Sequence, residues 1–322
     1  MRSDAWARLF RGCLCFVALL FAACEQDPGY GGHRSSDWIE KLQSGSSDER
    51  VRAAIALGKV LEIRPNFPEV VKALTSAVGD TSDAVRMAAA NALSAEGVDR
   101  LAALSEIHAA LHDSAHADVR ASTAYIIGGW GANRSTPLIP ALLEATKDSV
   151  ANVRAAAVEA LGMLKANDEP ELNAILKLAD DPYPAVRRAV LQTLLNLRAP
   201  AAVTLPPAQK ALSDSSESVR AAAAFALGDL RAGAVPALPA LIKALSDSSP
   251  LVRTGAAFAL GAMGRAAQSA APDLRRLTTD DSPQVAKIAT EALGIVSGTA
   301  EPRSSEPTEF EKCISAIRGT RC

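Results

Sequence analysis

The chain has 322 residues, of which 48% are hydrophobic, 22% charged and only 4% aromatic, and its formal net charge is −2. Three of the 34 basic and one of the 36 acidic side chains lie within the first 24 residues, so the remainder carries a net charge of −4. This charge excludes the broad basic surface that binding to nucleic acid phosphates needs, while the composition is that of an ordinary folded protein.

Residues 1–24 have the pattern of an export signal. Three arginines precede an apolar run that is too short to span a bilayer, as in the apolar region of a signal peptide. The run ends in Leu20-Phe21-Ala22-Ala23-Cys24, which resembles a bacterial lipobox. The resemblance implies that Cys24 carries a lipid and anchors the exported protein to a bacterial membrane, facing the periplasm or the cell surface. The alternative is an ordinary secretory signal, in which Cys24 is incidental.

Three further segments follow from composition. Residues 25–36 are polar and glycine-rich and predict a flexible tether. A capped helix start is expected at Asp37, so the folded domain is predicted over residues 37–297. Residues 298–322 begin with a Pro/Ser/Glu-rich linker and end in an apolar stripe that predicts a short helix in the tail.

The domain consists of copies of one sequence motif. The clearest copy runs from Asp214 to Gly228 and reads D-S-S-E-S-V-R-A-A-A-A-F-A-L-G. Its valine recurs every 33 or 34 residues, and a fixed period of this size indicates stacked supersecondary units. In the first copy the Leu57-Gly58 pair sets the register and puts Glu49 in the place of the valine. The repeat valines are Val51, Val85, Val119, Val153, Val186, Val219, Val252 and Val285.

Each copy predicts two helices. After the valine, apolar residues recur at +4, +7, +8 and +11, which is the 3.6-residue period of a helix. Serine followed by proline at Ser249 and Ser282 marks the start of this second helix, and Ser46 with Glu49 predicts a capping box in the first copy. A shorter first helix precedes it, with a proline that marks its first turn or a kink. These prolines are Pro140, Pro206, Pro239 and Pro272.

The line D-x-x-x-x-V-R-x-x-A-A-x-A-L-G, with its helix pair and proline, resembles HEAT repeats, most closely the short type also found in phycobilisome lyases. The resemblance implies an all-α fold, a right-handed α-solenoid of about eight HEAT-like helix pairs. It also implies that the arginine after each valine pairs with a loop aspartate between repeats. An anion-binding strip is the alternative, but a charge that recurs in every unit serves the stack. The arginines are Arg52, Arg86, Arg120, Arg154, Arg187, Arg220 and Arg253.

The sequence offers little for catalysis. It contains no G-x-S-x-G, Walker or H-E-x-x-H motif, and no cofactor is expected. His108, His112 and His116 are spaced by four, and two histidines one turn apart can share a metal. Because the helix is expected to end near Leu111, a solvated helix end is favoured. A metal-dependent or accessory enzyme using His108 and His112 remains the alternative function.

We therefore expect a non-enzymatic protein-binding or scaffolding lipoprotein of the bacterial cell envelope, which binds a protein partner along the concave face of the solenoid. A mainly structural spacer is a further alternative. The predicted partner is a protein, the membrane is contacted only through the lipid, and no nucleic acid is bound.

The binding face is predicted from the residue six positions after each valine, here called the +6 position, which points away from the stack. Phe225 and Phe258 occupy it in adjacent repeats, and exposed aromatic side chains often anchor interfaces. The predicted surface comprises Tyr125, Arg188, Gln192, Phe225 and Phe258. Partial burial of the phenylalanines between repeats is the alternative. Trp130, at +11, is expected in the core.

The last two cysteines of the chain, Cys313 and Cys322, are predicted to form a disulfide. Thiols of exported proteins tend to pair, and Gly319 between them allows the chain to turn.

Overall fold

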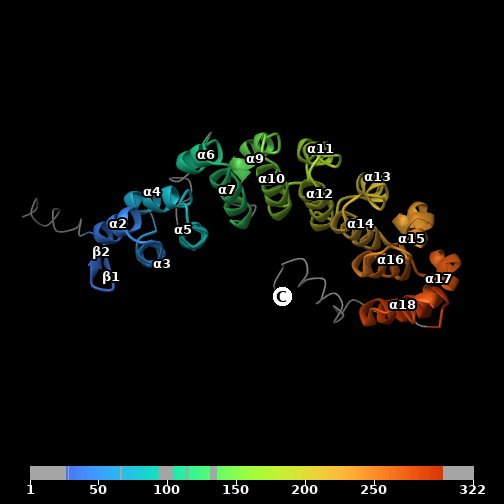
Figure 1. Cartoon of the computed structure of the whole chain (residues 1–322). Coiled ribbons are helices and arrows are strands. Elements are labelled where there is room, and N and C mark those ends of the chain that lie inside the picture. The colour runs from blue at the N-terminus through green and yellow to red at the C-terminus, as the bar shows by residue number, and fades with distance from the viewer. Residues whose placement is uncertain are drawn as a thin grey trace, which may run out of the picture. The chain divides into compact units, whose positions relative to one another are not determined.

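The computed structural model describes residues 27, 29–65, 67–93, 104–113, 115–130 and 136–299, and these ranges are helical almost throughout (Figure 1). The described helices form eight successive pairs, which confirms the all-α fold and the predicted number of repeats. The first pair is α2 (Ser35–Ser44) with α3 (Ser47–Ile63). The next three are α4 (Pro68–Ala77) with α5 (Asp83–Leu93), α6 (Leu104–Leu111) with α7 (Ala117–Gly129), and α9 (Ile139–Ala145) with α10 (Ala151–Met163). The last four are α11 (Glu169–Lys177) with α12 (Pro184–Asn196), α13 (Ala201–Ala211) with α14 (Glu217–Asp229), α15 (Leu238–Ala244) with α16 (Pro250–Met263), and α17 (Ala271–Leu277) with α18 (Pro283–Val296).

A small hairpin precedes α2. Strands β1 (Gly29–Tyr30) and β2 (His33–Arg34) pair antiparallel, and the Asp27 carboxylate accepts the Ser35 backbone N–H at 3.2 Å. Helix α2 begins at Ser35, and Asp37 accepts the N–H of Arg34 at 3.0 Å from inside its first turn. Of the predicted tether, the described residues up to 36 thus form a hairpin and the first turn of α2.

The predicted helix starts are confirmed. Ser46 accepts the N–H of Glu49, and the Glu49 carboxylate accepts the N–H of Ser46 at 2.8 Å, which is a capping box. Ser249 and Ser282 are the N-cap residues of α16 and α18, each followed by proline. Their side chains make no cap bond; their backbone N–H groups instead donate to the loop aspartate two residues earlier.

The recurrent prolines mark where the first helices begin. Pro140, Pro239 and Pro272 are each the second residue of an α-helix, where the missing N–H has no intrahelical partner to lose. Short 3-10 helices η1 (Thr136–Leu138), η2 (Arg231–Ala237) and η3 (Gly264–Ala270) lead into these α-helices. Pro206 differs, because it lies inside α13.

The chain divides into two compact units, of which unit 1 ends at Ala141 and unit 2 begins at Leu142. In unit 1, α3 packs beside α5. In unit 2, α10, α12, α14, α16 and α18 pack in succession, second helix against second helix, over a core rich in alanine and leucine (Figure 1). Trp130 is buried, as predicted for +11. Within the described ranges, no helix is both long and apolar enough to cross a membrane.

Candidate partner-binding surface

The +6 position of the second helices is open in unit 1 and covered in unit 2. In unit 1, Ile55 is 52% exposed, Tyr125 is 61% exposed, and Asn91 is exposed as well. In unit 2, Phe225 is only 9% exposed. The other members in unit 2 are half-buried, namely Glu159, Gln192, Phe258 and Glu291.

The exposure predicted for the phenylalanines is wrong. Phe225 is buried and Phe258 half-buried, with ring centroids 6.1 Å apart and ring planes tilted by 48°. Phe258 also packs against the apolar core of unit 2. The alternative interpretation, burial between neighbouring repeats, is the one that the structure confirms.

Two glycines explain why these rings fit between α14 and α16. A Cβ placed on Gly228 would lie 2.6 Å from Cε1 of Phe258, so the ring occupies the space above that glycine. A Cβ on Gly255 would lie 2.9 Å from the Cβ of Ala224 and 3.5 Å from Cε2 of Phe225. The missing side chains therefore let the two helices approach and give each aromatic ring a place between them.

Arg188 and Gln192 lie on α12, one repeat before the phenylalanines. Arg188 is exposed, as predicted, whereas Gln192 is half-buried and its Nε2 is buried without a hydrogen-bond partner. Glu159, at +6 in α10, is half-buried, and burial raises the pKa of its carboxyl group, an effect that the nearby Arg188 charge opposes. This stretch of unit 2 is thus more polar than the phenylalanine pair but less open than the surface of unit 1.

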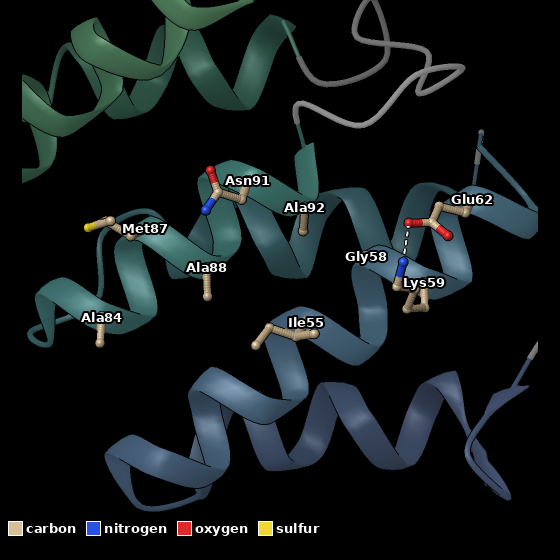
Figure 2. Close-up of a pocket in the computed structure, with 9 residues that line it drawn as sticks. All are labelled: Ile55, Gly58, Lys59, Glu62, Ala84, Met87, Ala88, Asn91 and Ala92. Carbon is tan, nitrogen blue, oxygen red and sulfur yellow. Dashed lines mark hydrogen bonds and ion pairs between the residues drawn. The ribbon is translucent and has the colours of Figure 1, made fainter. Parts of the chain in front are cut away.

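Unit 1 carries an apolar groove between α3 and α5 (Figure 2). Its volume is about 460 Å³. Small residues line it along both helices, and Ile55 from α3 and Met87 from α5 are its large apolar side chains. At one end the Lys59 ammonium donates to the Glu62 carboxylate at 2.6 Å. The lining residues are Ile55, Gly58, Lys59, Glu62, Ala84, Met87, Ala88, Asn91 and Ala92.

Met87 is the groove residue that sequence reasoning missed. It stands two residues after Val85 and is 66% exposed, more than Ile55 or Tyr125. The equivalent residues of unit 2 include the exposed Arg188 and Lys287, although Ala221 and Thr254 in the same column are buried. A long apolar side chain in a column that also holds charged residues was the available signal.

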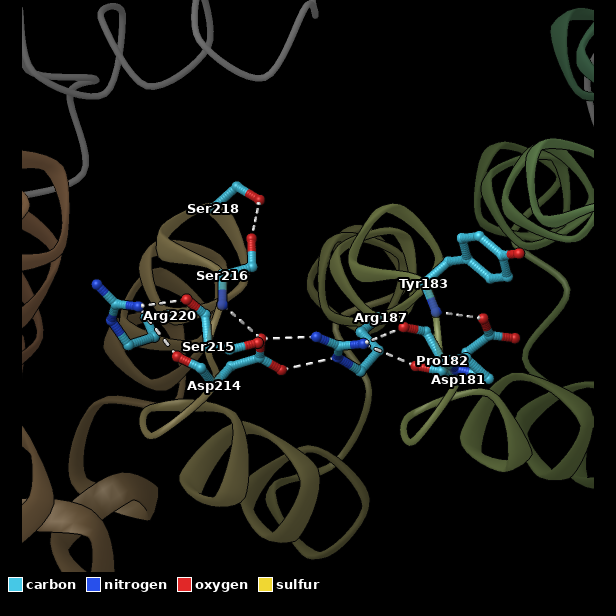
Figure 3. Close-up of polar contacts among 9 residues, drawn as sticks. All are labelled: Asp181, Pro182, Tyr183, Arg187, Asp214, Ser215, Ser216, Ser218 and Arg220. Atoms are coloured by element: carbon cyan, nitrogen blue, oxygen red, sulfur yellow. Dashed lines mark hydrogen bonds and ion pairs between the residues drawn. The ribbon is translucent and has the colours of Figure 1, made fainter.

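The predicted pairing of arginine with loop aspartate is confirmed as a link between neighbouring repeats (Figure 3). The Arg187 guanidinium donates from Nε and Nη2 to both Asp214 oxygens at 2.7 Å, and from Nη1 to the Asp181 carbonyl at 2.8 Å. Asp214 Oδ1 also accepts the N–H of Ser216 at 2.9 Å, which shapes the loop before α14. The same bidentate pairing recurs as Arg50–Asp80, Arg154–Asp181, Arg220–Asp247 and Arg253–Asp280.

The first repeat uses Arg50 rather than Arg52. Arg52 is exposed, while Arg50 follows Glu49, the residue that the Leu57-Gly58 register puts in the valine's place. Membership of Arg52 in the series is therefore wrong, and the Leu-Gly register is the correct guide. Because each of these arginines is satisfied by carboxylate and carbonyl oxygens, the described pairs hold repeats together rather than forming an anion-binding strip.

The histidines form a solvated helix end. Helix α6 ends at Leu111, as predicted, and the exposed rings of His108 and His112 stack with centroids 4.3 Å apart. The Nδ1 of His112 lies 2.8 Å from the His108 carbonyl oxygen, and His116 is the N-cap residue of α7. Among the described residues no group of three or more histidine, cysteine or acidic side chains could hold a metal ion.

Several predicted sites lie outside the described residues. They are the lipid-bearing Cys24 and the disulfide partners Cys313 and Cys322.

Comparison with known proteins identifies the repeat. A sequence model of HEAT repeats matches residues 35–108, 104–195 and 205–294, well over half of the chain. The chain belongs to the HEAT-repeat family. No curated protein sequence matches it.

Solved structures of HEAT-like and related repeat proteins resemble this HEAT-repeat chain in fold. A chain from the complex of Kap95p with RanGDP has a TM-score of 0.61 at 14% identity, over 91% of this chain and 44% of that one. YibA of Escherichia coli has a TM-score of 0.57 at 18% identity, over 81% of this chain and 92% of that one. A chain from the CpcE–CpcF complex of phycocyanin lyase from Nostoc sp. PCC7120 has a TM-score of 0.39 at 23% identity, covering 49% and 98%.

Proposed function

We propose that this HEAT-repeat protein is a non-enzymatic binding or scaffolding lipoprotein of the bacterial cell envelope, and that it binds a protein partner through the second-helix face of unit 1. A stack of HEAT-like repeats is a fold typical of protein binding, because it presents an extended surface made of many similar helices. The fold does not determine which partner is bound, so the partner must be inferred from the residues of the binding site.

The observation that carries the proposal is that three large apolar side chains on the second-helix face, one each on α3, α5 and α7, are left in solvent. Ile55, Met87 and Tyr125 are each more than half exposed, and the first two line one groove. Contiguous exposed apolar surface with polar groups at its margin is the usual mark of an interaction site. Methionine and tyrosine also suit such a role, since one adapts its shape and the other offers a ring with a polar end.

Export and anchoring rest on the N-terminal sequence. The arginines, the short apolar run and the lipobox-like ending support attachment of lipid at Cys24, and with it a position on an envelope membrane facing away from the cytoplasm. Arg188 and Gln192 in unit 2 are still predicted to be part of the partner-binding surface.

Site-specific photo-crosslinking in cells tests the binding face. A crosslinking amino acid at position 55 or 87 should label one and the same protein, whereas the same amino acid at exposed Lys72 on α4 should not. Ile55→Glu with Met87→Glu should abolish copurification of that protein, while Lys72→Glu should leave it intact. Equal labelling from position 72, or copurification that survives the double substitution, would refute this face as the binding site.

Membrane fractionation tests the anchor separately. The Cys24→Ala protein should leave the membrane fraction or remain unprocessed, while a control with Cys313→Ala should fractionate as wild type. A fully processed Cys24→Ala protein that stays membrane-bound would exclude the lipid anchor without bearing on the groove.

A further inference from the structure

The groove in unit 1 has a filled counterpart in unit 2. Gly58 in α3 and Gly228 in α14 occupy the same repeat position, one residue after the leucine. A Cβ on Gly58 would lie 2.9 Å from the Cβ and 3.3 Å from the Cα of Ala92, and a Cβ on Gly228 would lie 3.3 Å from the Cα of Ala259. Ala92 and Ala259 are themselves equivalent, so both helix pairs approach at the same point and leave a similar depression beside the glycine.

In unit 2 an aromatic side chain from within the chain fills this depression. The Phe258 ring lies over Gly228, with Cε1 and Cδ1 at 2.6 and 2.7 Å from the position of a Cβ there. The same ring covers the neighbouring +6 residue, Phe225, which is buried as a result. A flat ring therefore fits between two second helices of this repeat, over the glycine and against the preceding +6 side chain.

In unit 1 the Cβ of Ala92 lies above Gly58, and the groove beside it is open. The residue equivalent to Phe258 is Asn91, whose short amide lines the groove without covering Ile55. Ile55, the equivalent of Phe225, stays 52% exposed, and Met87 stands on the other side of the groove (Figure 2). The backbone arrangement is shared, so the difference between the two sites is the aromatic ring that α5 does not supply.

We infer that the groove between α3 and α5 takes an aromatic, phenylalanine-like side chain of a partner polypeptide, placed beside Gly58 and against Ile55 as the Phe258 ring lies at Gly228 and against Phe225. This inference rests on the proposed function and names the chemistry of the partner. The ring would cover Ile55 and contact the Met87 thioether, and sulfur–aromatic contacts are favourable. Asn91 and the Lys59–Glu62 pair lie along the same groove and give it a polar margin.

The groove suits a polypeptide better than a lipid surface. Its charged side chains, Lys59 and Glu62, are of opposite sign and already paired, so the site demands no anionic headgroup. Ile55, Met87 and the alanines of α5 give the groove an apolar lining, and its polar side chains are Asn91 and the Lys59–Glu62 pair, which suits a segment that presents a ring beside its polar backbone.

Methionine-methyl NMR of the full-length protein in detergent micelles tests the inference directly. The chain has four methionines, so the ε-methyl signal of Met87 can be assigned with a Met87→Leu variant, and buried Met263 serves as an internal control. The probe is N-acetyl-phenylalaninamide, titrated to millimolar concentration beside N-acetyl-leucinamide. We expect the phenylalanine probe to shift the Met87 signal upfield and to leave Met263 in place, and the leucine probe to produce no upfield shift.

A variant whose own side chain fills the groove provides the matched control. Asn91→Phe should place a ring where Phe258 stands in unit 2, move the Met87 signal upfield without any probe, and remove the response to the probe. Asn91→Ala should retain the response. An unmoved Met87 signal in the wild-type titration, an equal response to the leucine probe, or a full response in a folded Asn91→Phe protein would overturn the inference. The photo-crosslinking result at positions 55 and 87 would stand in each case, because it does not depend on which side chain of the partner enters.

Discussion

In α3 and α5 of unit 1 the +6 position holds Ile55 and Asn91, and both are exposed; in α14 and α16 of unit 2 it holds Phe225 and Phe258, which cover one another. The two helix pairs share one register and one close approach at a glycine. The comparison teaches that in this repeat the +6 position is neither core nor surface by geometry alone. At Phe225 it is buried because the next repeat supplies the Phe258 ring.

The largest expected contrast is in stability. Phe225→Ala should destabilise the protein by about 3 kcal/mol, because a buried ring is removed and the space between the two helices cannot fully close. Tyr125→Ala, at the same repeat position in unit 1, should change stability by no more than about 0.5 kcal/mol. Urea denaturation followed by circular dichroism measures both. Equal losses would show that the +6 position has the same role in the two units.

The link between repeats should matter next. Arg220→Ala removes a bidentate partner from Asp247 in a pair whose side chains are 15% and 13% exposed. The expected loss is about 2 kcal/mol, between the values for exposed and for fully buried pairs. Arg52→Ala, which truncates an exposed arginine on α3, is the control and should be nearly neutral. A neutral Arg220→Ala would mean that helix packing alone holds these repeats together.

The same pair predicts a pH dependence. Hydrogen bonds from the Arg220 guanidinium lower the pKa of Asp247 below its ordinary value. A lowered folded-state pKa gives stability that is present above the unfolded pKa of about 3.9 and is lost as the pH falls through the folded pKa. The stability difference between wild type and Arg220→Ala should therefore be full near neutral pH and shrink in acid below about pH 4. A constant difference down to the acid transition would contradict this origin.

Glycine substitutions test the same comparison between the units, with smaller expected changes in stability. Gly228→Ala should destabilise by about 1–2 kcal/mol, because its Cβ would meet the Phe258 ring, and the loss should be smaller in a Phe258→Ala background. Gly129→Ala in α7 of unit 1 is the control, since a Cβ there meets nothing within 4 Å. That variant should be neutral or stabilised by up to about 1 kcal/mol through helix propensity. Equal effects at both glycines would refute the steric account of Gly228.

Removing the groove side chains should have the smallest effect on folding. Ile55→Ser with Met87→Ser leaves an exposed surface more polar, so the stability should change by about 0.5 kcal/mol or less. Binding of the partner should nevertheless be lost, because these two side chains are the large apolar groups of the groove. A variant that unfolds at markedly lower urea would show that Ile55 and Met87 serve packing instead.

The sequence by itself determined what repeats in every copy. The spacing of the valines and the 3.6-residue period specify the helix pairs, and the loop aspartates specify the links between repeats. These features are local or recur at a fixed offset. The repeat sequence therefore contains both residue types of each contact, with one partner in each of two successive copies. In the first repeat the structure was needed to show that Arg50, and not the predicted Arg52, binds Asp80.

Only the tertiary structure decided which outward-facing positions are covered. Phe225 and Tyr125 occupy the same place in their own helices, yet Phe225 is 9% exposed and Tyr125 is 61% exposed. Phe258 and the glycines that admit its ring bury Phe225, whereas Asn91 leaves Ile55 and Met87 in solvent. Helical periodicity gives the direction of a side chain, but burial depends on the volume of the residues across the helix interface, which the pattern of a single copy does not contain.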